Sequence, residues 1–418
     1  MVPKQNAVKS FKGKLAVLYH YMHPDDVVSA LHFDGLSQDL AADGWDVEAF
    51  PCNRGCRDEI RTYVPSEIYK NVKYHRISRP RFQQASFVGR LLNSSWMIAK
   101  WTTLAFRSKG NRPDVIIVGT DPVFGALVAI PLRLFAPNTK LVHWCFDMHP
   151  EAAVVSGAIS NRSPLLIVAK AAMKLAYRRY DVIVDIGSCM RERLRAYGHH
   201  AAEHELTPWA IVEPDSYSRR SGATRNELFG DARLGVLYSG NFGEAHDFDE
   251  FLQLARRLRC RSDIRFCFAV RGNRADALRK AVTKEDKNVF FASFAPVEQL
   301  ETRLGSADIH LASLRHNWAG VAVPSKFFGS LASGRPILYA GPTQSAIANW
   351  IERFDIGWHL TEKSTDQVAE ALCVLAENPE KLTSLHKHCF QTYAEHFSRA
   401  KITGEWNQML DRTLHKAG

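Results

Sequence analysis

LGVLYSGNFGEAHDFDEFL, residues 234–252, contains the pattern from which the fold can be predicted. Its first residues form an apolar run of β-forming side chains, which is typical of a strand buried in a parallel sheet. The run ends at Gly240, and an amphipathic helix is expected over residues 248–258. A buried strand, a glycine turn and a helix in this order predict one βα unit of an α/β domain.

The same pattern recurs on both sides of this unit. Toward the C-terminus, further strands are expected at residues 264–270, 288–293, 307–313 and 335–341, and a helix at 326–333. Toward the N-terminus, strands are expected at 15–21, 46–50, 114–120, 140–147 and 181–187, and helices at 29–43, 165–180 and 190–198. The polar stretch 208–234 is the expected connection. Two such series predict an α/β protein with two Rossmann-like, doubly wound parallel-sheet domains that face each other across a cleft.

Composition limits the classes of partner. The chain has 418 residues and a net charge of +10, which favours anionic partners or simply keeps the protein soluble. Its 8 cysteines lack the spacing of a zinc site, so no metal is expected. No apolar run reaches about 18 residues, and the N-terminal segment MVPKQNAVKSFKGK does not resemble a signal peptide. These features predict a cytoplasmic protein.

Two motifs in the C-terminal half point to an anion site. The first is Gly240, Asn241, Phe242 and Gly243, which follow a strand and precede a helix. Glycines let the backbone approach a phosphate closely, and the amide groups at a helix start favour negative charge. A tight turn without any ligand would have the same sequence, and the motif is neither a dinucleotide fingerprint nor a P-loop.

The second motif is GVAVPSKFFGSLASGRPILYAGP, residues 320–342. Pro324 restricts the preceding residue to extended geometry, and Ser325 is placed to cap a helix that begins near Lys326. A cation in the first turn of a helix is disfavoured by the helix dipole, and a bound anion would remove that conflict. The alternative is a solvated surface lysine.

Together these motifs resemble glycosyltransferase family 4, with its GT-B fold, and most closely the bacterial enzymes of exopolysaccharide and O-antigen synthesis. The resemblance continues in the N-terminal half through Asp147, Pro150 and Glu151 in HWCFDMHPEAAVVSG, residues 143–157. It implies an N-terminal acceptor domain at residues 1–212, a donor domain at 213–395 and a C-terminal helix at 396–418 that packs back on the N-terminal domain.

The resemblance also implies a reaction. The expected activity is a retaining, metal-independent transfer of a sugar from a UDP- or GDP-sugar to a glycan or polyprenyl-linked acceptor, without a further cofactor. The residues expected at the donor are Gly240, Asn241, Phe242, Gly243, His246, Arg271, Pro324, Ser325, Lys326 and Phe327. Lys326 and the glycine backbone would supply positive charge to the leaving diphosphate. Arg271, after a strand, faces the cleft or is a surface arginine.

Other candidates follow strands of the N-terminal half. Asp147, with His149 as a further catalytic candidate, is positioned to orient the acceptor hydroxyl, although an aspartate after a strand is often a helix cap. His23, Asp25 and Glu151 are the expected acceptor contacts.

The sequence also departs from the family pattern. Many members carry two glutamates in the second motif, one near the sugar and one on the ribose, where this chain has Val321 and Gly329. Their absence motivates an alternative, a non-catalytic GT-B subunit that binds or assembles.

Residues 79–110 form a basic segment with interleaved aromatic side chains. It carries Phe82, Phe87, Leu91, Trp96, Trp101 and Phe106 among Arg79, Arg81, Arg90, Lys100, Arg107 and Lys109. A basic helix of this kind can lie on anionic lipid at the inner face of the plasma membrane. A core helix with solvated basic ends is the alternative. Nucleic acid is not expected as a partner, because no nucleic-acid-binding motif accompanies the charge.

Overall fold

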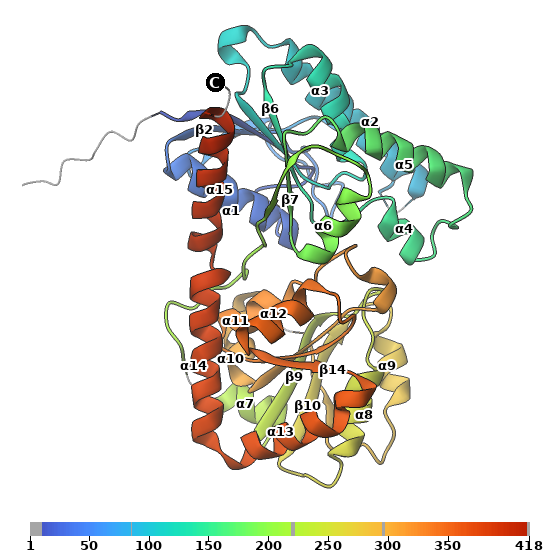
Figure 1. The fold of residues 1–418 in the computed structure, drawn as a ribbon, viewed down its shortest axis with the longest axis vertical. Helices are drawn as coiled ribbons and strands as arrows, with labels where there is room; N and C mark the ends of the chain where they lie inside the picture. The colour runs from blue at the N-terminus through green and yellow to red at the C-terminus, as the bar shows by residue number, and fades with distance from the viewer. Residues whose placement is uncertain (1–10, 85, 219–221, 295–296, 416–418) are drawn as a thin grey trace, which may run out of the picture. The chain divides into compact units, whose positions relative to one another are not determined.

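The computed structural model describes residues 11–84, 86–218, 222–294 and 297–415. Most of the N-terminal segment considered above therefore lies outside the described residues. The chain divides into two compact units. Unit 1 comprises Met1–Ile186, Met190–Leu206 and Thr403–Gly418, and unit 2 comprises Gly187–Cys189 and Thr207–Ile402. Each unit is built on a sheet of its own (Figure 1).

Unit 1 holds an eight-stranded sheet in the order β3-β4-β2-β1-β5-β6-β7-β8. All neighbouring strands are parallel except the antiparallel pair β3 and β4. The strands are β1 (Gly13–Leu18), β2 (Trp45–Ala49), β3 (Ser66–Tyr69), β4 (Val72–His75), β5 (Val115–Val118), β6 (Lys140–Trp144), β7 (Val182–Asp185) and β8 (Ala202–Glu205). The strand order reverses direction between β1 and β5, which is the position where ligands of open α/β sheets bind.

The helices of unit 1 connect these strands. They are α1 (Val28–Ala42), α2 (Phe87–Thr102), α3 (Ala129–Phe135), α4 (Glu151–Val155), α5 (Pro164–Tyr177) and α6 (Ser188–Arg195), with 3₁₀ turns η1 (Thr103–Phe106), η2 (Lys109–Asn111) and η3 (Gly125–Val128). Most of α15 (Arg399–His415) also packs here, because Trp406 is fully buried against Trp144 with 5.0 Å between the ring centroids. Asn407 on the same helix accepts a hydrogen bond from Trp45 Nε1 at 2.9 Å.

Unit 2 holds a six-stranded, fully parallel sheet in the order β11-β10-β9-β12-β13-β14. Its strands are β9 (Leu234–Asn241), β10 (Ile264–Arg271), β11 (Val289–Phe291), β12 (Ile309–Ser313), β13 (Ile337–Ala340) and β14 (Gly357–Leu360). This is the Rossmann order, and it reverses direction between β9 and β12. Gly240 and Asn241 are the last two residues of β9, so the glycine motif begins within this strand and lies at the reversal point of its sheet.

The helices of unit 2 fill the connections. They are α7 (Gly222–Phe229), α8 (Asp249–Arg257), α9 (Ala275–Ala281), α10 (Leu300–Ser306), α11 (Lys326–Ala332), α12 (Ala346–Phe354), α13 (Thr365–Glu377) and α14 (Pro379–His396), with 3₁₀ turns η4 (Val297–Gln299), η5 (His316–Trp318) and η6 (Glu362–Ser364). The stretch 208–234 is thus more than a connection, because α7 lies within it and buries Leu228 and Phe229.

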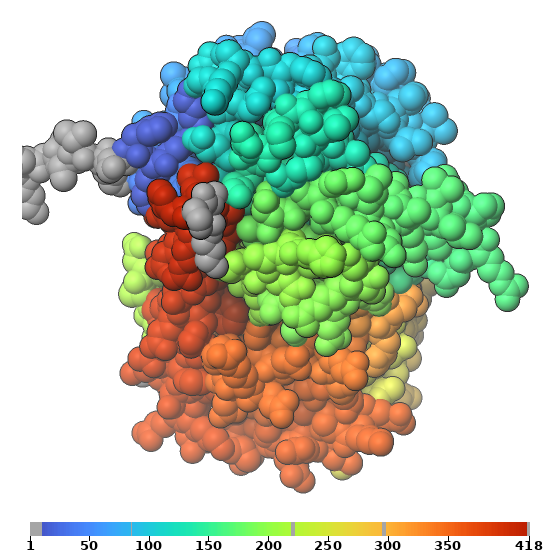
Figure 2. Space-filling model, turned by 45° about the horizontal axis from the view of Figure 1, so that its top comes forward, coloured from blue at the N-terminus to red at the C-terminus, as the bar shows by residue number. Residues whose placement is uncertain are grey.

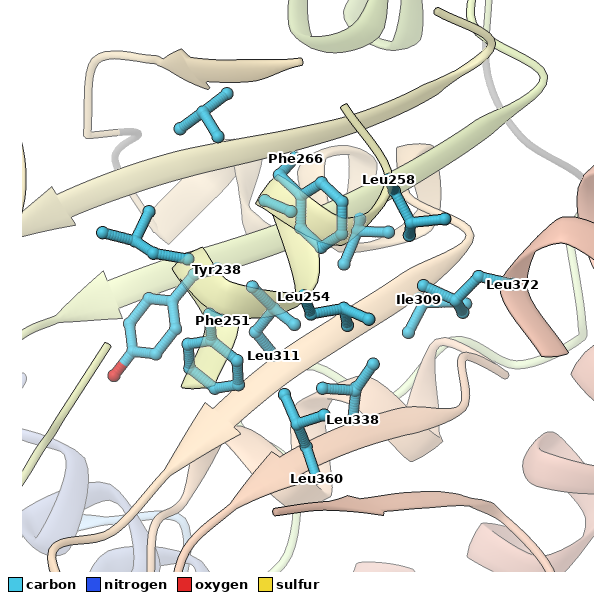
Figure 3. Close-up of a cluster of buried hydrophobic side chains, with 14 of the residues drawn as sticks. Tyr238, Phe251, Leu254, Leu258, Phe266, Ile309, Leu311, Leu338, Leu360 and Leu372 are labelled. Carbon is cyan, nitrogen blue, oxygen red and sulfur yellow. The ribbon is translucent and has the colours of Figure 1, made fainter. Parts of the chain in front are cut away.

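The core beneath the glycine motif is apolar and close-packed. Phe251 and Leu254 of α8 point at Tyr238 of β9 and at Leu311 of β12 (Figure 3). Because α8 and both strands share one core, the loop between β9 and α8 is fixed at both ends. The fold thereby holds the candidate site in place.

Candidate functional site

The glycine loop of unit 2 lies against Lys326. Gly240 has φ +135°, a conformation that side chains rarely adopt, and a Cβ atom added there would come within 2.8 Å of Lys326 Cε. Gly240 is therefore required for two reasons, its backbone angle and the space that the lysine side chain occupies. The two motifs of the C-terminal half, 86 residues apart in sequence between Gly240 and Lys326, meet at this contact.

The Lys326 ammonium has one direct partner, the carbonyl oxygen of Asn241 at 2.9 Å, and it lies 5.1 Å from the centre of the Tyr238 ring. No carboxylate pairs with it among the described residues. Burial lowers the pKa of Lys326 to about 8, although part of the side chain remains exposed. The amine is thus a cation near neutral pH that lacks a negative partner, which is the condition an anionic ligand would satisfy.

The start of α11 differs in one detail from the expectation. The helix begins at Lys326 as predicted, but the Ser325 side chain makes no capping hydrogen bond, because Ser325 already has helical backbone angles. The hydroxyl of Ser325 is exposed instead.

His246 lies beside the same loop as a neutral imidazole. Burial and the nearby Lys326 charge lower the pKa of His246 to about 3. Its Nδ1 atom lies 2.7 Å from the carbonyl oxygen of Ser313, which can only accept, so the proton resides on Nδ1 and Nε2 remains an acceptor. His246 can therefore accept a hydrogen bond from a hydroxyl group but cannot add positive charge for a diphosphate.

Arg271 ends β10, next to Asn241 in the parallel register of β9 and β10. The side chain is exposed, and its guanidinium carbon lies 3.9 Å from the centre of the Phe294 ring. Phe294, which follows β11 and is 40% exposed, is a residue that the sequence analysis missed. An exposed aromatic ring beside an arginine offers a flat surface on which a planar group can stack.

Three expected donor residues direct their side chains elsewhere. Phe242 packs against Tyr238 with 5.0 Å between centroids, and Phe327 packs against Trp350 at 5.0 Å, both with no exposed surface. Pro324 is also buried. The side chains of these residues fix the glycine motif and α11 in the core. The backbone amides of Phe242 and Phe327 already donate to the carbonyl oxygens of Arg271 and Pro324, so neither residue offers a free donor to a ligand.

The positions of the two missing glutamates are filled by apolar packing. Val321 is fully buried. A Cβ atom added at Gly329 would come 3.3 Å from Leu304 Cδ1, so this side of α11 is closed by a neighbouring helix.

The candidates in unit 1 fall into two groups. Asp147 and His149 act on each other electrostatically, and Asp121 acts on both. The Asp147 carboxylate is accessible to solvent, although surrounding protein raises its pKa by desolvation. Asp121 follows β5 at the reversal point of the sheet and lies 3.6 Å from the Nδ1 atom of the buried His20. The sequence analysis missed Asp121 and His20.

The expected acceptor contacts are mostly engaged within unit 1. His23 stacks on Tyr69 with 3.9 Å between centroids. Asp25 accepts a hydrogen bond from the backbone amide of Cys56 at 3.0 Å. Glu151 begins α4 and accepts a hydrogen bond from the Tyr197 hydroxyl at 2.6 Å. These interactions give all three side chains a structural role, and within the described part of the chain no hydrogen bond or ion pair joins His23 or Asp25 to Asp147.

Metal and membrane features complete the description. Across the described ranges, no three His, Cys, Asp or Glu side chains gather closely enough to hold a metal ion. In the same ranges, no helix is both long and apolar enough to span a bilayer.

Comparison with known proteins gives consistent matches. Residues 30–209 match the family model of the glycosyl transferase 4-like domain. A probable glycosyltransferase of Pseudomonas aeruginosa, WbjE, is 23% identical over 308 residues, which cover 71% of this chain and 74% of the relative.

Solved structures match over nearly the whole chain. Sucrose-phosphate synthase of Thermosynechococcus elongatus superposes with a TM-score of 0.69 at 14% identity, covering 97% of this chain and 100% of the other. HepE of Anabaena, solved with UDP, superposes with a TM-score of 0.64 at 13% identity, covering 95% and 99%. The two parallel sheets and these superpositions show that the chain has a GT-B fold, and residues 30–209 are similar to the glycosyl transferase 4-like domain.

Proposed function

We propose that unit 2 binds the diphosphate of a UDP- or GDP-sugar, and that the chain transfers the sugar to a glycan or polyprenyl-linked acceptor in polysaccharide biosynthesis. The observation that carries this proposal is the contact between Gly240 and Lys326, which places an ammonium without a carboxylate partner beside a glycine loop. UDP is the first nucleotide to test, because HepE, with the same fold, was solved with UDP and with UDP-glucose.

The proposed chemistry requires charge stabilisation at the leaving group. The bond between the anomeric carbon and the diphosphate oxygen breaks, and the diphosphate keeps the electron pair. The Lys326 ammonium and the loop amides meet this charge, so no step calls for a metal ion. The acceptor oxygen forms the new bond to the anomeric carbon, and its proton passes to the leaving diphosphate. Asp147 is proposed to orient the acceptor hydroxyl, and His149 is the neighbouring alternative. Retention of configuration is proposed from the family resemblance.

The binding half of the proposal is tested by thermal stabilisation with UDP and GDP separately. A nucleotide at one hundred times its Kd stabilises the folded state by roughly 2.7 kcal/mol. The catalytic half is tested by a donor screen against a lipid-linked acceptor, scored for nucleotide diphosphate release. Stabilisation by one nucleotide and release with one donor support the proposal. Failure of both nucleotides to bind contradicts it.

A second candidate is a non-catalytic GT-B subunit that binds or assembles. The buried Val321 and the closed packing at Gly329 favour it, because the carboxylates that contact sugar and ribose in many relatives have no replacement at those positions. This candidate predicts no nucleotide release with any donor and acceptor pair in the screen, whether or not a nucleotide binds.

We also propose peripheral attachment to the inner face of the plasma membrane through α2. The apolar side chains Phe87, Val88, Leu91, Leu92 and Trp96 are exposed along this helix. Arg90 is exposed among them, and Lys100 lies over the Trp96 ring at 5.1 Å. Two residues of the predicted segment do not take part. Trp101 is buried and donates to the Phe50 carbonyl at 2.8 Å, and Arg79 is buried.

A further inference from the structure

A second helix of unit 1, α5, presents an apolar outer face. Leu166, Met173, Ala176 and Tyr177 point inward and are buried. On the opposite side Ile167, Val168 and Leu175 are 42–68% exposed, and Leu165 in the first turn is 52% exposed. Single exposed apolar residues are common on protein surfaces, but three on one face of a helix form a patch that a protein surface rarely carries without a partner.

The charge of this helix is of one sign. Residues 161–180 contain Arg162, Lys170, Lys174, Arg178 and Arg179 and no Asp or Glu. Lys170 and Lys174 are exposed, and neither ammonium group forms an ion pair or a hydrogen bond with any described residue. A helix with an apolar face and unpaired cations along it is complementary to an anionic lipid surface. The same combination fits poorly against a second copy, because the cations of the two helices would repel each other.

A hollow of about 350 Å³ adjoins α5, where it meets α4 and α6. Lys170, Lys174 and Arg193 line it, together with Glu151 and Tyr197. Glu151, the only carboxylate among these five, accepts a hydrogen bond from the Tyr197 hydroxyl, and the two ammonium groups of Lys170 and Lys174 outnumber it. The hollow is larger than one phosphate group, so a lipid headgroup phosphate can enter it.

α5 lies near α2, the helix that is proposed above to attach to the membrane. Both α2 and α5 pack on η3. Figure 1 shows α5 and the loop that leads to it from α4 projecting from unit 1 on the side away from α15, and in Figure 2 the green region that contains α5 stands out from the surface. The exposed apolar and basic side chains of α2 and α5 can therefore belong to one continuous surface.

We infer that the outer face of α5 docks on an anionic lipid bilayer and that the hollow beside it receives a lipid headgroup phosphate. This inference rests on the proposed membrane attachment of the chain and adds a second helix and a phosphate position to it. The apolar patch enters the headgroup region, and Lys170 and Lys174 remain at the level of the phosphates.

The test is co-sedimentation of the full chain with vesicles of phosphatidylcholine alone and of phosphatidylcholine with phosphatidylglycerol. The wild-type chain is expected to bind the anionic vesicles and to release them at high salt. The double variant Ile167→Glu/Val168→Glu is expected to bind about tenfold more weakly or worse, since each side chain loses its transfer free energy into lipid. Lys170→Glu/Lys174→Glu should lose the preference for anionic vesicles.

Matched controls are Val374→Glu, an exposed apolar residue of α13 that is 45% exposed, and Lys387→Glu, an exposed lysine of α14. Both controls are expected to bind vesicles as the wild-type chain does. Wild-type affinity in both α5 variants overturns the inference. A wild-type dimer in vesicle-free solution that Ile167→Glu/Val168→Glu converts to monomer also overturns it, in favour of a second copy as the occupant.

UDP-induced thermal stabilisation of every variant separates this inference from the proposed function. All four variants keep a folded unit 2, so each should be stabilised by UDP as the wild-type chain is. Loss of vesicle binding with intact UDP binding supports the α5 surface alone. If UDP stabilises none of the chains while vesicle binding is intact, the result contradicts the proposed donor site but supports the proposed lipid-binding surface.

Discussion

The reversal points of the two sheets have the same backbone arrangement but opposite chemistry. In unit 2, the loop after β9 offers glycine backbone and the Lys326 ammonium. In unit 1, the residues after β5 and β6 offer Asp121, Asp147 and His149. A Rossmann-like sheet fixes where a ligand binds, whereas the few residues at the strand ends decide what kind of ligand it is. Unit 2 is suited to an anion and unit 1 to a hydroxyl group.

The largest expected effect tests the anion side. Lys326→Met should lower sugar transfer by about 10³-fold, comparable to the loss of a strong transition-state donor. The free energy of unfolding should not fall, because burial already disfavours the charged amine in the ligand-free protein. Nucleotide release kinetics and thermal melts measure the two quantities. Sugar transfer at the wild-type rate, or loss of both activity and fold, would contradict the assignment of Lys326 to the anion site of unit 2.

The next effect tests the hydroxyl side. Asp147→Asn should slow transfer by about 10²-fold, the scale of one positioned acid–base group, while leaving UDP affinity unchanged. The split between rate and donor affinity is the informative readout, since a residue of the donor site would change both. Asp25→Asn serves as the comparison, because Asp25 is held by the Cys56 amide. A loss of UDP affinity in Asp147→Asn would contradict the assignment of this residue to the acceptor.

A smaller effect is expected from Gly240→Ala. The added methyl group would meet Lys326 Cε, and the φ of +135° is strained for alanine, so UDP affinity should fall about tenfold with roughly 1–3 kcal/mol lost in stability. Gly305→Ala is the matched control. No atom lies within 4 Å of a Cβ at Gly305, which lies inside α10, so this variant should be neutral or slightly more stable. Equal UDP affinity and equal stability of Gly240→Ala and Gly305→Ala would contradict the requirement for glycine at position 240.

The smallest effect is a pH dependence. Because the pKa of Lys326 is lowered to about 8, the ligand-free amine loses its proton as the pH rises through that value. An anion binds the protonated form, so UDP affinity should be constant below about pH 7 and fall about fivefold between about pH 8 and pH 9, with proton uptake on binding. Calorimetry in buffers of different ionisation enthalpy measures the uptake. Lys326→Met should abolish both signals.

Much of unit 2 could be predicted from the sequence, because its strands are continuous apolar runs. The helix expected at 248–258 was found as α8 at Asp249–Arg257. In unit 1, β3 and β4 were not predicted, since β3 is a short edge strand whose Ile68 is 73% exposed and gives no core signal. The expected strand at 140–147 ends at Trp144, and Asp147 lies in the loop beyond it.

Site residues could be predicted only where they belong to a local sequence motif. Gly240 and Lys326 stand in motifs, so both could be found. Phe294 and Asp121 could not, because their relevance comes from strand order, which places the ends of β11 and β5 beside β10 and β1. The sequence also could not reveal that His246 is neutral, since this depends on its burial and on the Ser313 carbonyl.

The central claim is that the Gly240 loop and Lys326 together hold the donor diphosphate. Isothermal titration of UDP, and separately of GDP, into the wild-type chain and into Lys326→Met at neutral pH tests it most directly. One nucleotide is expected to bind the wild-type chain saturably, and at least about tenfold weaker binding is expected for a folded Lys326→Met chain, because one charged hydrogen bond is lost. Equal affinity in both chains, or no binding of either nucleotide to the wild-type chain, would contradict it.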